Sequence, residues 1–66
     1  MRVFVNGIAH DCGEQCTLTE LLEHLAVAPT SCATAVNGAF VARQLRSATK
    51  LSPNDHVMTF EPITGG

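Results

Sequence analysis

Residues 17–25 read Thr-Leu-Thr-Glu-Leu-Leu-Glu-His-Leu, a segment that combines a helix-start signal with an apolar helix face. Thr17 followed three residues later by Glu20 matches a capping box, in which each side chain bonds the backbone N–H of the other residue. Apolar residues then recur at the i, i+3, i+4, i+7 spacing of one helix face: Leu18, Leu21, Leu22 and Leu25. The pattern predicts an amphipathic helix of about three turns that Pro29 ends.

An Asn-Gly pair stands on each side of this helix, between short apolar runs. Asn-Gly is a strong hairpin signal because both central positions of the turn need a positive φ. Asn6-Gly7 and Asn37-Gly38 therefore each predict a two-stranded hairpin. The four strands predicted from these signals are residues 1–6, 8–12, 32–36 and 39–41.

The rest of the chain offers one more strand. Residues 42–51 predict only an irregular or 3₁₀ turn, residues 52–55 a turn by composition, and residues 56–60 the last strand. The order hairpin, helix, hairpin, strand predicts an α+β fold: a mixed sheet of about five strands packed on one amphipathic helix. With the first and last strands parallel at the centre, this is the β-grasp, or ubiquitin-like, arrangement. We expect one domain over 1–61 and a flexible C-terminal tail over 62–66.

Length and charge exclude several classes of function. The chain has 66 residues, and a domain of this size buries only about 60% of the surface its unfolded form exposes. An enclosed active site would weaken so small a core, so we expect no enzyme. Four basic residues against six acidic ones, with no Trp or Tyr, argue against nucleic-acid binding. The sequence shows neither a signal peptide nor a membrane span, so we expect a cytoplasmic protein that does not bind membranes.

The cysteines and histidines do not form a recognisable chemical site. Cys12, Cys16 and Cys32 are odd in number, and no two ligands stand at the usual zinc spacing, so we expect no metal. The histidines are scattered: His10, His24 and His56. No spacing favours a Cys–His nucleophile, and we expect no catalytic residue in this chain and reduced thiols in the cytoplasm.

The C-terminal pair Gly65-Gly66 is the feature that carries chemistry. An end without Cβ atoms can thread a narrow channel in another protein, and Gly65 supplies that clearance. The terminal carboxylate of Gly66 is an anion at neutral pH and a poor electrophile. To react it must first be activated, most simply as an acyl-adenylate formed from ATP with Mg²⁺ on a partner enzyme. The chain itself would bind no cofactor.

Over its whole length the sequence resembles the ThiS-type sulfur carrier proteins of thiamin (thiazole) biosynthesis, a ubiquitin-like β-grasp family. The resemblance rests on residues 3–7, the capping-box segment 17–22, residues 35–38 with Val41 and Arg43, Leu51 before the Asp55 turn, and Gly65-Gly66. One departure is Asn54 at a position where the family usually has Gly. Another is the stretch 60–63, which resembles the Pro-rich tail of the small molybdopterin-synthase subunit.

The resemblance implies a carrier role and a set of partners. A ubiquitin-activating-type adenylyltransferase would adenylate Gly66, and a persulfide sulfur donor would displace AMP to leave a thiocarboxylate on Gly66. Thiazole synthase would then receive the sulfur. Two alternatives stay open: a sulfur carrier of the molybdopterin-synthase small-subunit type, and a ubiquitin-like protein modifier that forms isopeptide bonds through Gly66.

Strand alternation predicts a partner-docking face. Val3 and Val5 would face the helix and Phe4 would face away, because successive side chains point to opposite sides of a sheet. In the last strand Val57 would pack inward. Phe4, Met58 and Phe60 would then form an apolar patch beside the tail, and such patches mark interfaces. The alternative is a bulge that turns Phe60 inward.

Overall fold

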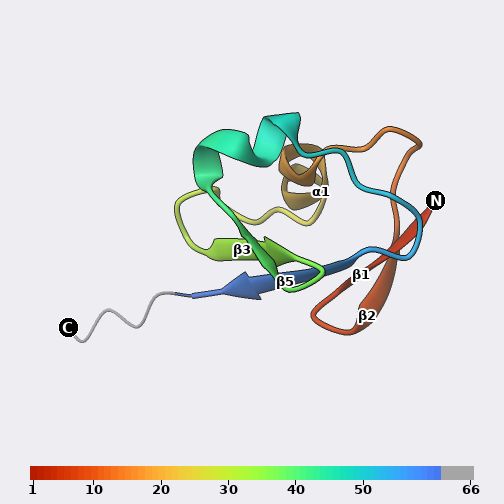
Figure 1. Ribbon diagram of the computed structural model, residues 1–66, viewed down its shortest axis with the longest axis horizontal. Coiled ribbons are helices and arrows are strands. Elements are labelled where there is room, and N and C mark those ends of the chain that lie inside the picture. Colours follow the sequence, from red (N-terminus) through yellow and green to blue (C-terminus); the bar gives the residue numbers. More distant parts are fainter. Residues whose placement is uncertain (62–66) are drawn as a thin grey trace.

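The computed structural model describes residues 1–61 and shows a five-stranded mixed sheet covered on one face by helix (Figure 1). The elements in chain order are β1 (Arg2–Val5), β2 (Ile8–Asp11), α1 (Leu18–His24), β3 (Ala33–Val36), β4 (Ala39–Val41), the 3₁₀ helix η1 (Arg43–Ala48) and β5 (His56–Phe60). The sheet order is β2-β1-β5-β3-β4, with β1 and β5 parallel and every other pair antiparallel. The predicted β-grasp topology is confirmed. The predicted tail, 62–66, lies outside the described residues.

Helix α1 begins as predicted and ends earlier than predicted. Thr17 Oγ1 accepts a bond from the Glu20 N–H at 3.1 Å, and Glu20 Oε1 accepts one from the Thr17 N–H at 3.0 Å. The prediction that Pro29 ends the helix was wrong, since α1 has seven residues and Leu25 is its C-cap. Ala26 takes φ +58°, and its N–H and that of Val27 bond back to earlier carbonyls, as in a Schellman motif. Glycine usually occupies this position, so Ala26 is not recognisable in the sequence as the end of a helix.

Both predicted hairpin turns have the expected backbone. Asn6 and Gly7 have φ +51° and +84°, and Asn37 and Gly38 repeat these values. The strands match the prediction apart from end residues: Met1, Asn6, Cys12 and Cys32 lie just outside them. Asn54 has φ +67°, so the turn before β5 contains a left-handed residue, a conformation that Asn tolerates.

The two turn asparagines also hold β5 in place. Asn6 Oδ1 accepts a bond from the Thr59 N–H at 3.0 Å, and its Nδ2 donates to Thr59 Oγ1 at 2.9 Å. Asn37 Oδ1 accepts a bond from the His56 N–H at 2.9 Å. Each hairpin therefore bonds the central strand through one side chain, in addition to the ladder hydrogen bonds. In the sequence, these asparagines predict only turns.

The core lies between the sheet and α1. Val3, Val5 and Val57 are buried, as alternation predicted, against the buried face of the helix. The helix residues in this cluster are Leu18, Leu21 and Leu22, and Cys16, Val41 and Leu51 complete it. No helix among residues 1–61 is long and apolar enough to cross a membrane.

Arg46, in η1, is buried although it is charged. It is only 3% exposed, and its guanidinium donates to three neutral oxygens. The bonds run from Nε to Thr34 Oγ1 at 3.0 Å, from Nη1 to the Pro29 carbonyl at 2.9 Å and from Nη2 to the Cys32 carbonyl at 2.7 Å. Arg46 thus ties η1 to β3 and to the loop that precedes it.

We expect Arg46→Ala to lower the free energy of unfolding by about 2–4 kcal/mol, because two carbonyls and one hydroxyl lose their donor and a cavity remains. Arg43→Ala, at an exposed position in the same helix, should change it by no more than about 0.5 kcal/mol. Urea denaturation of both variants provides the measurement. Equal midpoints for Arg46→Ala and Arg43→Ala would show that the buried bonds do not stabilise the fold.

Candidate functional site: the central strand and the helix-free face

Strand β5 is the part of the fold that leads to the C-terminus. It lies at the centre of the sheet between β1 and β3, and the asparagine bonds described above fix it from both sides. The strand ends at Phe60, which pairs with Ala33. Gly65 and Gly66, the predicted sites of clearance and adenylation, lie outside the described residues. The structure therefore places the base from which they extend and not the glycines themselves.

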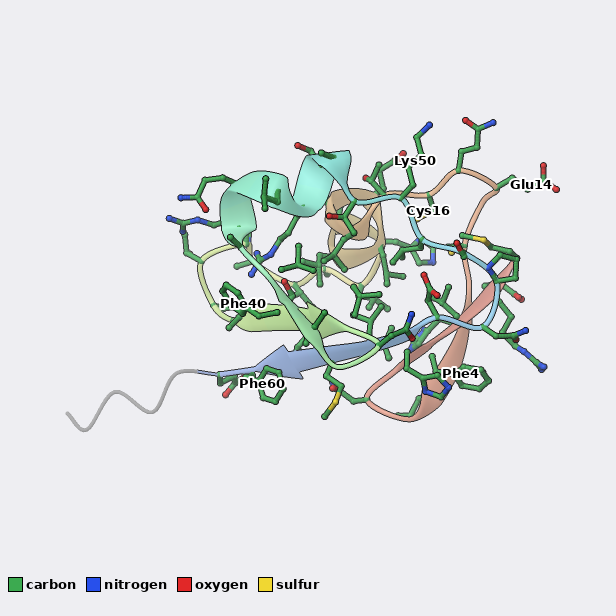
Figure 2. All side chains as sticks on the ribbon, viewed as in Figure 1. Phe4, Glu14, Cys16, Phe40, Lys50 and Phe60 are labelled. Carbon is green, nitrogen blue, oxygen red and sulfur yellow. The ribbon has the colours of Figure 1, made fainter. Side chains whose placement is uncertain are left out.

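The face of the sheet opposite α1 carries the three predicted docking residues. Phe4 lies opposite His56 in the parallel pair, so it shares a face with His56, Met58 and Phe60. Met58 is 45% exposed and Phe60 is 48% exposed. Phe60 keeps its ladder register with Ala33, so no bulge turns it inward. Figure 2 shows Phe4 and Phe60 pointing away from the helices.

The structure adds Phe40 to this surface. Phe40 pairs with Ala35, and Ala35 pairs with Met58, so these three residues share a face. Phe40 is 72% exposed. We define the sheet-face patch as Phe4, Phe40, Met58 and Phe60 with the small residues Ala33 and Ala35 between them. Alternation within the short strand 39–41 could have predicted Phe40, but only the strand order shows that it lies near β5.

Phe4 differs from the other aromatic residues of the patch. It is half-buried, and its ring stacks on the His56 ring with centroids 4.8 Å apart and planes 13° apart. The Arg2 guanidinium lies 5.6 Å from the centre of the same ring. Phe4 therefore has aromatic and cationic partners within the chain, whereas Phe40 is largely exposed and Met58 and Phe60 are about half exposed.

The comparisons with known proteins fit this geometry. The sequence model of the ThiS family matches residues 3–66. The chain belongs to the ThiS family. A crystal structure described as thiamine biosynthesis protein (ThiS) from Geobacter metallireducens is 30% identical, with a TM-score of 0.85 and full coverage of both chains. A solution structure of a thiamine biosynthesis protein from the same organism is 32% identical, with a TM-score of 0.77, covering all of this chain and 88% of the other. Among curated proteins, no sequence matched.

Membership of the ThiS family supports a role as a sulfur carrier that interacts with partner enzymes of thiamine biosynthesis. The family match extends through Gly65 and Gly66, so it includes the residue predicted to bear the sulfur, Gly66, and the residue predicted to give it clearance, Gly65. Among residues 1–61, no group of three His, Cys, Asp or Glu side chains is placed to hold a metal ion.

The cysteines of this ThiS-family chain are free, and two of them lie far from β5's end. Cys12 is half-buried, and Cys16 and Cys32 are buried. Cys12 and Cys16 line a hollow at the end of the molecule opposite Phe60, where Figure 2 labels Cys16. Burial raises the pKa of the Cys16 thiol from 9.0 to about 11, and a hydrogen bond and charge interaction with Cys12 and the charge of Glu20 act in the same direction.

We expect Cys16 to resist alkylation, because the thiolate is the reactive form and a pKa of about 11 leaves almost none at pH 8. Iodoacetamide at pH 8 should modify the more accessible Cys12 first and reach Cys16 only after denaturation, as peptide mass spectrometry would show. Equal labelling rates for Cys12 and Cys16 in the folded protein would show that burial does not protect Cys16.

The raised pKa of Cys16 also makes the stability of the fold depend on pH. The unfolded chain loses the Cys16 proton near pH 9.0, before the folded chain does. The contribution of this thiol to the free energy of unfolding is therefore complete below pH 9 and declines towards pH 11.

Proposed function

We propose that this ThiS-family protein carries sulfur as a thiocarboxylate on Gly66 and donates it to thiazole synthase in thiamin biosynthesis. The observation that supports this most directly is the family match through residue 66. The Geobacter structures similar to this chain are described as thiamine biosynthesis proteins, and full-length coverage of the crystal structure extends the similarity over the whole chain. The proposed site of action is the cytoplasm, where thiols are kept reduced.

The chemistry requires a partner enzyme at each step. A carboxylate oxygen of Gly66 attacks the α-phosphorus of ATP on a ubiquitin-activating-type adenylyltransferase, and pyrophosphate leaves with Mg²⁺ neutralising its charge. The terminal sulfur of a persulfide then attacks the carbonyl carbon, and AMP leaves. A thiolate of the donor enzyme cleaves the resulting acyl disulfide, which forms a protein disulfide and releases the thiocarboxylate. ATP and Mg²⁺ belong to the partner, and this chain is its co-substrate.

In this proposal the sheet positions the C-terminal segment and binds the partner, and it takes no part in the chemistry. A central strand held by two neighbours and two asparagine side chains gives the terminal glycines a rigid base. The sheet-face patch beside that strand gives a partner an apolar surface on which to dock, since aromatic residues and Met are enriched at interfaces. A partner bound on the patch would cover Phe60, the last residue of β5 and the strand end nearest to the C-terminus in sequence. Clearance at Gly65 then lets the carboxyl group enter a narrow active site.

The test is conversion of the purified chain. Incubation with its adenylating enzyme, ATP, Mg²⁺ and a persulfide donor should replace one C-terminal oxygen by sulfur, as seen in the intact mass. The product should lose that sulfur to thiazole synthase. Sulfur transfer to the large subunit of molybdopterin synthase instead would support the molybdopterin-type carrier. Isopeptide conjugates to lysines in cell lysate would support a protein modifier.

A further inference from the structure

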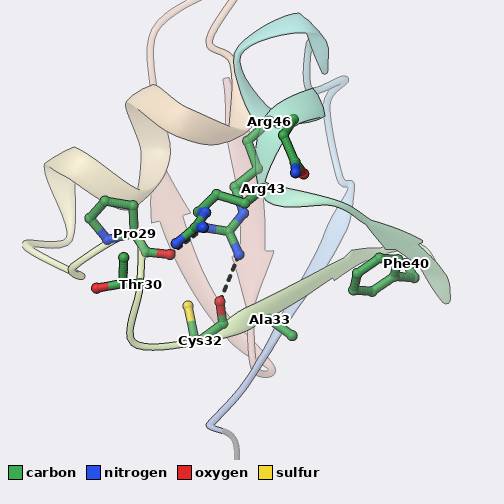
Figure 3. Close-up of a pocket in the computed structure, with 8 residues that line it drawn as sticks. Pro29, Thr30, Cys32, Ala33, Phe40, Arg43 and Arg46 are labelled. Atoms are coloured by element: carbon green, nitrogen blue, oxygen red, sulfur yellow. Dashed lines mark hydrogen bonds between the residues drawn. The ribbon is translucent and has the colours of Figure 1, made fainter.

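A hollow next to the sheet-face patch contains two arginines. It has a volume of about 280 Å³ and lies between η1, β4 and the loop that precedes β3 (Figure 3). Its lining includes Pro29, Cys32, Ala33, Phe40, Arg43 and Arg46. The two arginines stand three residues apart in a 3₁₀ helix, where side chains at i and i+3 eclipse one another. Both therefore lie on the same side of η1.

The positive charge in this hollow has no carboxylate partner among residues 1–61. The buried Arg46 guanidinium bonds only a hydroxyl and two backbone carbonyls, all of them neutral. Arg43 is exposed and brings a second charge to the same lining. Glu23 lines an adjoining hollow on the α1 side together with Arg43 and Arg46, but it forms no ion pair with either arginine. Among the described residues, the lining of the 280 Å³ hollow itself contains two cations and no carboxylate, which favours a negatively charged ligand.

The hollow is continuous with the surface on which a partner is proposed to dock. Ala33 and Phe40 line it and also belong to the sheet-face patch. Ala33 pairs with Phe60, the last residue of β5. A protein that covers Met58 and Phe60 would therefore also cover the opening of the hollow. Covering removes water from Arg43, and a charge pair is stronger when it is desolvated.

We infer that this hollow receives an aspartate or glutamate side chain of the adenylating enzyme when that enzyme docks on the sheet-face patch. The inference rests on the proposed function, because it names the chemistry of that function's partner. A guanidinium can donate two parallel hydrogen bonds to a planar carboxylate, and the exposed guanidinium of Arg43 can do so here. Arg46 contributes only its positive charge, because its own N–H groups already bond Thr34 and the loop that precedes β3. The net charge of −2 and the absence of other clustered basic residues argue against a nucleic acid as the ligand.

The experiment measures the affinity of the full chain for the adenylating enzyme at low and high salt. Arg43→Gln should weaken binding by about tenfold or more at low salt and flatten the salt dependence, because it removes one charge of the pair. Arg43→Lys keeps the charge but cannot form the two parallel hydrogen bonds. Its affinity for the enzyme should lie between the affinities of Arg43→Gln and the unaltered chain. Lys50→Gln is the matched control, since Lys50 is exposed on the helix side of the molecule (Figure 2). This variant should bind within about twofold of the unaltered chain with the same salt dependence.

Thermal melting first establishes that each variant is folded, which the exposed position of Arg43 predicts. If Arg43→Gln and Lys50→Gln bind alike while Met58→Ala binds weakly, no carboxylate enters the hollow, although the docking face and the carrier role stand. If the unaltered chain neither binds the enzyme nor accepts sulfur, the proposed function fails, and this inference fails with it.

Discussion

Removal of Gly66 is expected to abolish thiocarboxylate formation while leaving the fold intact. The reaction needs the terminal carboxylate to meet the α-phosphorus of ATP, and shortening the chain by one residue withdraws that carboxylate by about 3.3–3.6 Å. A displacement of about 1 Å can already cost 100-fold in rate. Because the core consists of residues 3–57, the melting temperature should not change. Intact mass after incubation with the adenylating enzyme, ATP and a persulfide donor measures the loss.

Two further variants test whether the reaction depends on the position of the terminal carboxylate or on a cysteine thiol. One extra residue after Gly66 keeps a carboxylate but misplaces it, and it should be as inactive as the deletion. Cys32→Ser removes the buried thiol that stands next to Ala33, the residue paired with Phe60 at the end of β5. A folded Cys32→Ser chain should accept sulfur normally. Sulfur on the chain that lacks Gly66, or loss of sulfur acceptance in folded Cys32→Ser, would move the reactive site from the terminus to a thiol.

Truncation of the exposed patch residues should weaken partner binding strongly. We expect Met58→Ala and Phe60→Ala each to weaken binding of the adenylating enzyme by about 1–3 kcal/mol, or about 5- to 150-fold in Kd, as anchors at the centre of an interface do. Both side chains are about half exposed, so the free chain should lose little stability. Titration calorimetry gives the affinity, and thermal melting gives the stability.

An exposed apolar residue outside the sheet-face patch serves as the control for loss of apolar surface. Leu45 is 57% exposed and lies in η1, outside the sheet-face patch. Leu45→Ala should therefore leave partner affinity unchanged. Phe4→Ala should lower the melting temperature more than Met58→Ala does, because Phe4 is half-buried and stacks on His56. Unchanged affinity in both Met58→Ala and Phe60→Ala would show that partners dock elsewhere.

Some features of this protein follow from a few adjacent residues, and sequence alone determined them. The Thr17–Glu20 capping box sets the start of α1, since its two hydrogen bonds span three residues. The Asn-Gly pairs set both hairpins because they tolerate positive φ. Alternation placed Val3, Val5 and Val57 in the core. Together with the order of the elements, these local signals were sufficient to predict the topology, and the terminal glycine pair predicted Gly66 as the reactive residue.

Other features depend on residues that only the folded chain brings together. The bond between Asn6 and Thr59 joins positions 53 apart in sequence, and no local pattern encodes it. Arg46 reads as a surface charge in the sequence, yet carbonyls of a distant loop satisfy its buried guanidinium. Phe40 joins the patch only because β4 pairs with β3 and β3 with β5. Sequence determines conformations fixed by a residue's own dihedral angles and near neighbours, whereas strand register decides which distant side chains share a surface.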